Sequence, residues 1–395
     1  MMVSKFMKSL KFIKLKDILA ILIFILMIVP SIIYKMYLKI SSKKIWIICE
    51  DPNEARDNGY HLFKYIRINH KNDYVYYAIN KKSEDYKKIE KYGNIVSFGS
   101  LKHWLYYLCA DLNISTHKYG NPNPPLFYVL QVSGLLKNKR IFLQHGITMN
   151  NVSFVNYKNS KFRLFICAAK REYEFVKENF GYPEDYVKLL GFSRFDNLYN
   201  NKVNQKQIVI MPTWRSYISK NNLNFLETDY YKKYYSLINN KKLINYIEKN
   251  KIKIYFYLHR NMQKYEKYFN SISKSIIIVR NNEIDIQKLL KDSALLITDY
   301  SSVSLDFAYM NKPLIYYQFD QEEFIKNHLD SGYFSYSKDG FGPVIIEENN
   351  LVKKICNYID NDYEIEKKYQ KRCDDFFELR DQNNSERIYE ELKRI

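Results

Sequence analysis

The sequence has little glycine and little cysteine. Eleven of its 395 residues are glycine, less than half of the average usage of about 7%. It contains no GxGxxG and no GxxxxGK[ST], so it lacks the glycine-rich loops of dinucleotide-binding and P-loop proteins. HExxH and CxxC are also absent, which removes the common signals of zinc sites. Five scattered cysteines, at positions 49, 109, 167, 356 and 373, fit no disulfide framework and favour a reducing compartment.

Acidic residues are outnumbered by basic ones. The chain has 62 Lys and Arg against 43 Asp and Glu, a formal charge of +19. The imbalance is largest in residues 1–44, where Asp17 is the only acid among many lysines. A basic chain can bind nucleic acid, but no nucleic-acid-binding motif is present. An anionic membrane and a polyanionic product explain the charge more simply, and we expect no nucleic-acid partner.

The longest apolar run, Ile18–Tyr34, lies between two groups of lysines. As a helix, 17 residues reach about 25 Å, which is short of a hydrocarbon core of about 30 Å. Lysines on both sides would place one basic group on the wrong face of a membrane if the segment crossed it. We therefore expect a shallow or re-entrant anchor on anionic lipid, with a single span as the alternative. In both cases the body of the protein faces the cytoplasm.

Beyond residue 44 the sequence alternates between short apolar runs and helical patterns, which is typical of parallel α/β domains. Predicted strands are 45–49, 74–79, 95–98, 112–116, 141–143, 164–168, 187–190, 208–211, 252–258, 276–279, 295–297 and 314–317. Predicted helices include 58–69, 83–92, 101–110, 284–292 and a charged helical region at 351–395. An Asn-rich polar stretch near residue 200 predicts the domain boundary. The expected parts are a membrane-anchoring segment 1–43, an N-terminal domain 44–200, a C-terminal domain 201–350 and a helical tail 351–395 that packs back on the domains.

Polar groups with useful chemistry follow several of these strands. His145 comes after RIFLQ with Gly146 beside it, Arg215 after IVIMPTW, and His259 after IYFYL. Because ligands of parallel sheets bind beyond the carboxyl ends of the strands, these positions favour a site. A histidine there can act as a general base, and an arginine can donate to a phosphate. Each residue alone is as consistent with an ordinary capping or surface role, and only their shared position after strands favours a site.

The turn Thr298–Ser302 follows another buried strand and opens a short helix. Ser301 or Ser302 is a suitable N-cap, and free amides at a helix N-terminus attract phosphate. An ordinary capped turn that binds nothing is the alternative. Asp360 and Asp362 form a DxD pair that resembles a metal-binding motif. They fall in the charged helical tail rather than after a strand, which argues against a metal there.

Several short runs follow one another along the chain: QHG, GFSRFD, PTWR, TDYSSVSLDFAYMNKPLIYYQFD and GYFSYSKDGFGPVI, with IWIICEDPNEARDNGYHLFKYI near the start. In this order they resemble the CDP-glycerol glycerophosphotransferase family of teichoic acid primases and polymerases. The resemblance covers nearly the whole chain from Lys44. The TDYSS run is the most specific piece, and the others are short.

The resemblance implies a GT-B-like fold, with two Rossmann-like domains facing a cleft, on a monotopic membrane enzyme. It implies transfer of an alditol phosphate, glycerol phosphate foremost, from CDP-glycerol or CDP-ribitol to a hydroxyl of a lipid-linked glycan or polymer. CMP is the second product, and the pathway is teichoic-acid-like or capsule polymer synthesis at the cytoplasmic face of a bacterial cell membrane. By the family's motifs, His145 is the expected base and His259 lies near the diphosphate. The residues expected to hold donor phosphates or alditol are Arg215, Thr298, Ser301, Ser302, Asp306 and Asp320.

The sequence departs from the family pattern at a few positions. The usual His-Gly-Thr-Pro is His145-Gly146-Ile147-Thr148 here, and Ser193 replaces the proline of Gly-x-Pro-Arg. Neither change removes a proton-transfer or phosphate-binding group, so we expect a divergent acceptor or alditol. We expect no resident cofactor; assistance by a divalent ion and a homo-oligomeric state stay open. The alternatives are a GT-B glycosyltransferase using a nucleotide sugar and a non-catalytic membrane-attached scaffold.

Overall fold

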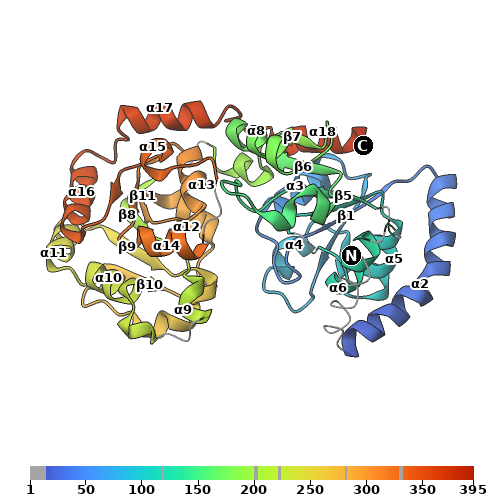
Figure 1. The fold of residues 1–395 in the computed structure, drawn as a ribbon, viewed down its shortest axis with the longest axis horizontal. Helices are drawn as coiled ribbons and strands as arrows, with labels where there is room; N and C mark the ends of the chain where they lie inside the picture. Colours follow the sequence, from blue (N-terminus) through green and yellow to red (C-terminus); the bar gives the residue numbers. More distant parts are fainter. Residues whose placement is uncertain are drawn as a thin grey trace. The chain divides into compact units, whose positions relative to one another are not determined.

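The computed structural model describes residues 15–117, 120–132, 134, 136, 138–199, 203–220, 224–280, 283–328 and 332–395. The chain folds into two compact units. The first unit comprises residues 1–145, 152–196 and 381–395, and the second comprises 146–151 and 197–380. Each unit is a parallel sheet between helices (Figure 1). The predicted α/β class is confirmed.

The sheet of the first unit has seven strands in the order β3-β2-β1-β4-β5-β6-β7, and all of their pairings are parallel. The strands are β1 (Ile45–Cys49), β2 (Tyr74–Ile79), β3 (Ile95–Ser97), β4 (Leu112–Ser115), β5 (Lys139–Phe142), β6 (Leu164–Cys167) and β7 (Val187–Leu189). From β1, the strands β2 and β3 are added on one side of the sheet, and β4 to β7 are added on the other side, so the strand order reverses between β1 and β4. Such a reversal opens a crevice at the carboxyl ends of the two strands, where ligands of doubly wound folds bind.

The helices of this unit are α2 (Leu15–Ile40), α3 (Asn58–Asn69), α4 (Tyr86–Glu90), α5 (Leu101–Cys109), α6 (Pro124–Val132), α7 (Tyr157–Ser160), α8 (Lys170–Asn179) and α18 (Asn384–Arg394). Side chains cap several of them. Asp57 accepts from the amide of Asn58 at the start of α3, and Ser100 accepts from His103 at the start of α5. These contacts satisfy amides that lack a partner in the first turn of a helix.

The sheet of the second unit has six parallel strands in the order β10-β9-β8-β11-β12-β13. They are β8 (Asn204–Ile210), β9 (Lys253–Tyr257), β10 (Ile276–Val279), β11 (Ser293–Thr298), β12 (Leu314–Tyr317) and β13 (Val344–Ile345). The helices are α9 (Ser216–Lys220), α10 (Asp229–Ile238), α11 (Lys241–Lys249), α12 (Ile286–Asp292), α13 (Val303–Tyr309), α14 (Gln321–His328), α15 (Tyr336–Asp339), α16 (Glu348–Asp360) and α17 (Lys367–Phe376). Here the order of strands reverses between β8 and β11.

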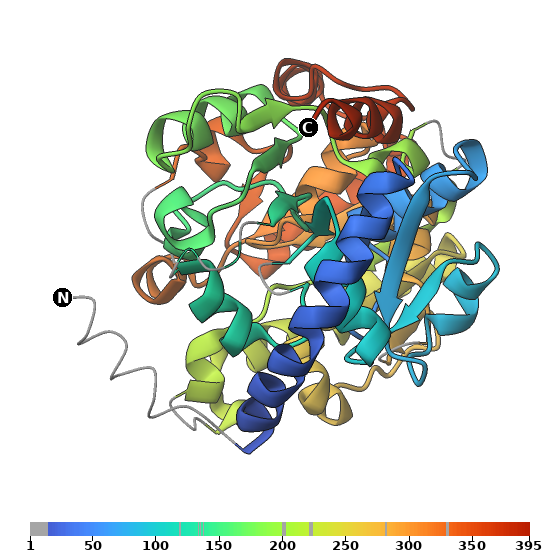
Figure 2. The ribbon, with the colours of Figure 1, turned by 90° about the vertical axis from the view of Figure 1, so that its right-hand side faces the viewer.

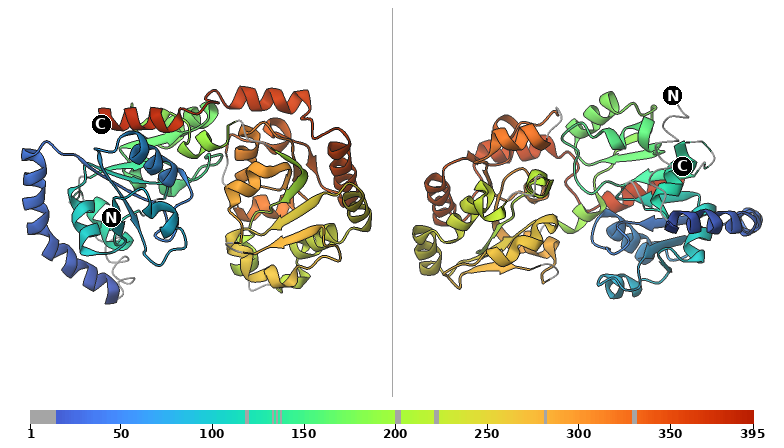
Figure 3. Two further views of the ribbon diagram at one scale, coloured as in Figure 1. Left: turned by 180° about the vertical axis from the view of Figure 1, so that it is seen from behind. Right: turned by 60° about the horizontal axis from the view of Figure 1, so that its bottom comes forward.

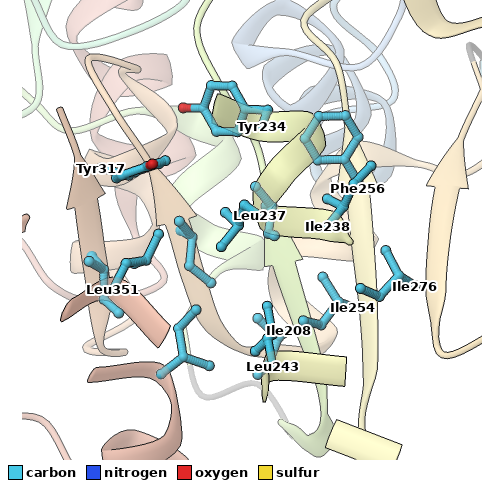
Figure 4. Packing of buried hydrophobic residues seen from close by; sticks show 14 of the residues in the cluster. Ile208, Tyr234, Leu237, Ile238, Leu243, Ile254, Phe256, Ile276, Tyr317 and Leu351 are labelled. Carbon is cyan, nitrogen blue, oxygen red and sulfur yellow. The ribbon is translucent and has the colours of Figure 1, made fainter. Parts of the chain in front are cut away.

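Figure 4 shows the apolar core on one face of this second sheet. Ile208, Ile254 and Ile276 from neighbouring strands meet side chains of helices α10, α11 and α16. Leu237 of α10 and Leu351 of α16 are fully buried in this layer. The sheet is seen from behind, with helices on either side of it, in Figure 3. This core fixes the strands whose carboxyl ends carry the candidate site.

Helix α2 is a continuous helix of 26 residues that lies along one side of the first unit (Figure 2). Ala20, Met27 and Leu38 are buried against the unit, and Tyr34 stacks on Tyr106 of α5 at 5.9 Å. The opposite side of α2 is apolar and exposed. The large apolar side chains exposed on α2 are Ile18, Leu19, Ile21, Leu22, Ile25, Leu26, Ile28, Val29, Ile32, Ile33, Met36, Tyr37 and Ile40.

Several predicted elements have their observed bounds: β1, β2, β10, β12 and α3. The predicted helix at 83–92 is shorter, because only Tyr86–Glu90 is helical. Helix α6 was not predicted, since its sequence begins with Pro124 and Pro125. Proline is compatible with the first turn of a helix, where its missing amide has no intrahelical partner.

Candidate functional site

In the second unit, the PTWR and TDYSS segments follow β8 and β11, the two strands between which the order reverses. The amide of Thr213 donates to Asp299 Oδ1 at 2.8 Å, which ties the two segments together. His259 follows the neighbouring strand β9, and Asp320 follows β12. The predicted donor-side residues therefore gather at one edge of this sheet, as expected from their shared position after strands.

Arg215, however, faces inward and is completely buried. Its Nε and Nη2 donate to the two carboxylate oxygens of Asp320, at 2.7 and 3.0 Å. Nη2 also donates to Asp299 at 2.9 Å, and Nη1 donates to the carbonyl of Thr213 at 2.9 Å. The guanidinium carbon also lies 5.1 Å from the centre of the Tyr300 ring. All three nitrogens have partners within the protein. The geometry thus gives Arg215 the role of an internal link, and its assignment as a phosphate ligand stays a prediction.

Thr298 and Asp320 are engaged in the same way. The Thr298 hydroxyl donates to the carbonyl of Met211 at 2.6 Å and joins β11 to β8. Asp320 accepts from Arg215 and also from the hydroxyl of Tyr300, at 3.2 Å. Asp306 lies in α13 and is only 9% exposed. The predicted donor-binding roles of these three residues are untested, and their side chains are largely withdrawn from solvent.

Ser301 and Ser302 differ from these buried residues because they are accessible. Ser302 is exposed and takes the N-cap position of α13, but its side chain makes no capping hydrogen bond. Ser301 Oγ accepts a long bond of 3.4 Å from the amide of Val303. Helix α13 has only seven residues, so its dipole adds little to anion binding. The two hydroxyls, rather than the helix, are the groups available to a ligand.

The segment that follows His145 packs in the second unit, beside these serines. A Cβ atom added to Gly146 would lie 3.3 Å from Ser302 Oγ. Further along, Asn150 forms an antiparallel bridge with Gly332, and the amide of Tyr333 donates to the carbonyl of Met149 at 3.2 Å. Glycine at position 146 therefore allows the backbone to approach the TDYSS turn closely.

His259 caps the 3₁₀ segment Arg260–Tyr268, with Nδ1 accepting from the amide of Asn261 at 3.2 Å. This bond leaves the proton of the neutral ring on Nε2. The ring of Trp214 stacks on the His259 ring, with 6.2 Å between the ring centres. Burial lowers the pKa of His259, the positive charge of Arg260 lowers it further, and Asp299 opposes both. At neutral pH the ring is therefore neutral and presents Nε2–H as a donor.

In the first unit, His145 lies just past the carboxyl end of β5. Gln144 before it has a left-handed backbone, with φ 59°, which is uncommon outside glycine. The Gln144 side chain donates to the carbonyl of Ile166 at 2.6 Å and to Glu172 at 2.9 Å, and it is buried. These bonds hold the turn and hence the direction in which His145 leaves the strand.

The ring of His145 is oriented by residues after the neighbouring strand β4. Its Nδ1 lies 3.3 Å from the carbonyl of Thr116, which can only accept, so Nδ1 carries the proton. Nε2 then has a free lone pair and can accept a proton. The ring stacks on His117 at 5.0 Å with an interplanar angle of 2°. The Thr116 hydroxyl in turn bonds Nδ1 of His117 at 2.8 Å.

His117 was not predicted from the sequence, although it also follows the carboxyl end of a buried strand, which is the signal that found His145. Glu50, which follows β1 and is buried, was not predicted either. Glu50 accepts from the amides of Arg56, Asp57 and Tyr60 at 2.7–3.2 Å. Burial raises the pKa of Glu50, and the nearby Asp57 raises it further. Glu50 thus organises the first turn of α3 below the site.

A buried network connects α3 to the His145 loop. Asn58 donates to the carbonyls of Leu143 and Gln144, at 3.3 and 2.8 Å, and accepts from the amide of Arg194 at 3.1 Å. The Arg194 side chain pairs with Asp57 at 3.1 Å. The arginine of the GFSRFD run therefore supports the His145 loop from inside the unit, which no local sequence pattern reveals.

Among the described residues, no group of three or more His, Cys, Asp and Glu side chains could hold a metal ion. The DxD pair lies at the end of α16, where Asp360 accepts a bond from the hydroxyl of Tyr246. The expectation that the protein has no resident cofactor is not tested by this observation and stays a prediction.

Two doubly wound parallel sheets with histidines and hydroxyls after their strands define a GT-B-like protein of two Rossmann-like units. The sequence profile of the CDP-glycerol:poly(glycerophosphate) glycerophosphotransferase family matches residues 32–394, and the chain belongs to this family. This confirms the resemblance seen in the sequence.

Curated relatives and a solved structure agree with the assignment. The chain is 36% identical over 381 residues to the minor teichoic acid biosynthesis protein GgaB of Bacillus subtilis (strain 168), covering 92% of this chain and 41% of GgaB. It thus spans less than half the length of that relative. It is 25% identical to the teichoic acid poly(glycerol phosphate) polymerase of Bacillus spizizenii, covering 84% of this chain and 87% of that protein.

The wall teichoic acid polymerase TagF has a similar fold, with a TM-score of 0.65 at 18% identity over 97% of this chain and 98% of that one. UDP-GlcNAc 2-epimerase from Neisseria meningitidis shares the fold at a TM-score of 0.52 and 10% identity, over 89% of this chain and all of that one.

Proposed function

We propose that the protein transfers an alditol phosphate, glycerol phosphate foremost, from a CDP-alditol to a hydroxyl of a lipid-linked glycan or polymer. The family supports CDP-glycerol-type transfer in teichoic acid synthesis. The observation that carries the proposal for this chain is the fixed orientation of His145. Its Nδ1 is bonded to the Thr116 carbonyl, so Nε2 is available as a base.

In this proposal the hydroxyl oxygen of the acceptor attacks the β-phosphorus of the CDP-alditol. A new O–P bond forms, the bond from that phosphorus to the bridging oxygen breaks, and CMP leaves with the bridging oxygen. His145 Nε2 takes the proton of the attacking hydroxyl. A positioned general base of this kind contributes about 10²–10⁴-fold to the rate.

On the donor side, we assign His259, Ser301 and Ser302 to the diphosphate. Nε2–H of the neutral His259 ring and the two hydroxyls are donors that need no change of protonation to meet a phosphate oxygen. Donors fixed before the reaction stabilise developing negative charge without reorganisation. Arg215, Thr298 and Asp320 then act indirectly, because they hold the segments that carry these donors.

The membrane location rests on α2. By length and composition, residues Ile18–Ile40 could cross a membrane. However, one side of α2 packs on the first unit from Ala20 to Leu38, near both ends of the helix. If α2 crossed a bilayer, the polar parts of the unit beside it would enter the hydrocarbon, which is strongly unfavourable. We therefore place α2 in the plane of the membrane interface, at the cytoplasmic face, with its exposed apolar side in lipid.

The test is CMP release by the purified full chain with lipid-linked glycan acceptor and CDP-glycerol, CDP-ribitol or a set of nucleotide sugars. The proposal expects CMP from a CDP-alditol, and its loss in His145→Asn. Asparagine keeps an amide N–H that can donate to the Thr116 carbonyl, so this variant removes the base while retaining the orienting bond.

Other outcomes separate the alternatives. Turnover of a nucleotide sugar in place of every CDP-alditol would assign the protein to the GT-B glycosyltransferases. Binding of CDP-glycerol with no turnover of any donor would support a scaffold. Unchanged turnover in His145→Asn would remove His145 from the proton transfer, whichever donor is used.

A further inference from the structure

The opposite edge of the first sheet has a basic cavity that the proposed reaction does not use. It has a volume of about 370 Å³ and lies at the amino-terminal ends of β1 and β2. Its lining includes Ser42, Lys43, Lys44, Trp46, Tyr74 and Lys393. His145 follows β5 at the carboxyl edge, so the cavity and the catalytic base lie at opposite edges of one parallel sheet. We name it the amino-edge pocket.

The amino-edge pocket is positively charged and contains few acids. Three lysines line it, and its one carboxylate, Asp73, already accepts a bond of 2.7 Å from the Tyr389 hydroxyl. Lys393 Nζ is 3.9 Å from Asp73. Asn72 adds a neutral donor to the lining. This composition suits an anionic group with several acceptor oxygens, such as a phosphate.

The pocket is also joined directly to the membrane-facing helix. Helix α2 ends at Ile40, and Ser42, Lys43 and Lys44 of the pocket follow within four residues. Lys43 Nζ lies 5.7 Å from the ring centre of Tyr37, on the exposed side of α2, and 4.8 Å from that of Tyr74 in the pocket. Tyr37 is 51% exposed and Ile40 is 83% exposed. Tyrosine and lysine at the end of an apolar segment are typical of the headgroup level of a membrane.

The backbone at the junction between α2 and the pocket turns through a left-handed residue. The amide of Lys43 donates to the carbonyl of Leu38, and that of Ser42 to Lys39, which closes the helix with a left-handed residue. That residue is Ser42, with φ 52°, where glycine is the usual choice. Serine costs about 1 kcal/mol more than glycine in such a conformation. Ser42 is one of the residues that line the amino-edge pocket.

We propose that the amino-edge pocket binds the phosphate of an anionic phospholipid headgroup while α2 lies in the interface. The ammonium groups of Lys43, Lys44 and Lys393 surround the phosphate, and Trp46 and Tyr74 form the apolar wall. This inference rests on the membrane location of α2 proposed above. It gives the membrane contact a specific lipid site, distinct from the acceptor and donor sites.

The experiment measures binding of the full chain to phosphatidylcholine vesicles with and without phosphatidylglycerol, by co-sedimentation. Lys43→Gln/Lys44→Gln is expected to weaken binding to the anionic vesicles by about fivefold for each lysine, and to leave binding to neutral vesicles unchanged. The matched control is Lys81→Gln/Lys82→Gln. It removes the same charge from exposed residues beyond the carboxyl end of β2, about 20 Å away by strand length.

A second variant is expected to strengthen binding to anionic vesicles instead of weakening it. Asp73→Asn removes the one negative charge of the pocket and keeps an oxygen that can accept from Tyr389, so binding to anionic vesicles should tighten. Equal losses in the two lysine pairs would overturn the inference, because binding would then depend on net charge alone. Lack of binding to either vesicle would overturn the membrane location as well, whereas CMP release would still test the proposed reaction.

Glycerol phosphate in solution separates a lipid site from a site for free phosphate. The inference expects free glycerol phosphate to compete only weakly with anionic vesicles, because α2 supplies the rest of the binding. Strong competition, or a thermal shift with glycerol phosphate that Lys43→Gln/Lys44→Gln abolishes, would assign the pocket to a soluble phosphate compound and overturn the lipid assignment.

Discussion

Arg215 joins three segments of the second unit through buried hydrogen bonds to Asp299, Asp320 and the carbonyl of Thr213. Removing the cation leaves two buried carboxylates without a compensating positive charge, although each keeps a neutral hydrogen-bond donor. We therefore expect Arg215→Met to lower the free energy of unfolding by about 3–5 kcal/mol, measured by chemical denaturation. Arg280→Met is the matched control, because Arg280 is exposed and its pair with Glu266 should contribute at most about 1 kcal/mol. A stable Arg215→Met protein with impaired donor binding would instead support a direct phosphate contact.

The two ring nitrogens of His259 have different roles. Nδ1 accepts from the amide of Asn261, and Nε2 carries the proton and can donate to a ligand. His259→Asn keeps an acceptor near Nδ1 and loses the donor at Nε2, so it should stay folded. We expect kcat/KM for the donor to fall by about tenfold to hundredfold, since a hydrogen bond to a charged group contributes about 1.5–3 kcal/mol. His259→Gln, with an amide nearer to Nε2, should recover part of this loss in the same steady-state assay. Equal activity of both variants and the unmodified protein would exclude a role in donor binding.

The lowered pKa of His259 also sets the sign of a pH effect. The folded-state pKa lies below the unfolded value of about 6.5, so the unfolded chain binds the proton first. The stability that comes from the neutral ring is complete above pH 6.5 and is lost as the pH falls below that value. An NMR titration of the His259 ring should give a midpoint below 6.5. A midpoint at or above 6.5 would contradict this expectation.

At the scale of elements, α18 returns to the first unit and is held there by Asp196 of the GFSRFD run. Asp196 accepts from the amides of Asn384 and Ser385 at 2.8 and 2.9 Å, at the start of α18. We expect Asp196→Ala to destabilise the first unit by about 1–2 kcal/mol, as for the loss of a good N-cap. The loss of stability is measured by thermal unfolding and by hydrogen exchange of the α18 amides. Asp375→Ala, an exposed carboxylate paired with Lys371 in α17, is the control and should change stability by a few tenths of a kcal/mol.

Element positions were predictable where one face or the whole strand is apolar, as for β1, β10 and β12, because the pattern reports burial directly. The site was predictable only in part. The rule that polar residues after parallel strands gather at one edge correctly placed His145, His259 and the TDYSS turn at the carboxyl ends of their strands, while their roles in a reaction stay predictions. It could not show that Arg215 faces inward, since its partners Asp299 and Asp320 lie 84 and 105 residues away. Long-range pairing of this kind leaves no local signal in one sequence.

At the scale of the whole molecule, two hypotheses for α2 can be separated: a helix that lies in the membrane interface and a helix that spans the bilayer. They predict different orientations of α2. A helix in the interface plane has both ends on the same side of the bilayer, and a spanning helix has them on opposite sides. We expect cysteines introduced by Leu15→Cys and Ser41→Cys, each made separately, to react with a membrane-impermeant thiol reagent on protein bound to the outside of sealed vesicles. The unmodified chain gives the background of its own cysteines, four of which are buried.

The same prediction has a second arm that separates the two sides of α2. Leu22 and Leu26 are 54% and 71% exposed, whereas Met27 packs against the first unit. Leu22→Glu/Leu26→Glu should abolish vesicle binding and leave thermal unfolding nearly unchanged, because these side chains face lipid in the proposed orientation and are exposed on the folded unit. Met27→Glu should instead lower the unfolding temperature, since it buries a charge against the unit. Protection of Leu15→Cys in sealed vesicles while Ser41→Cys reacts would show that α2 spans the bilayer, and the first unit would then have to release the helix it packs against.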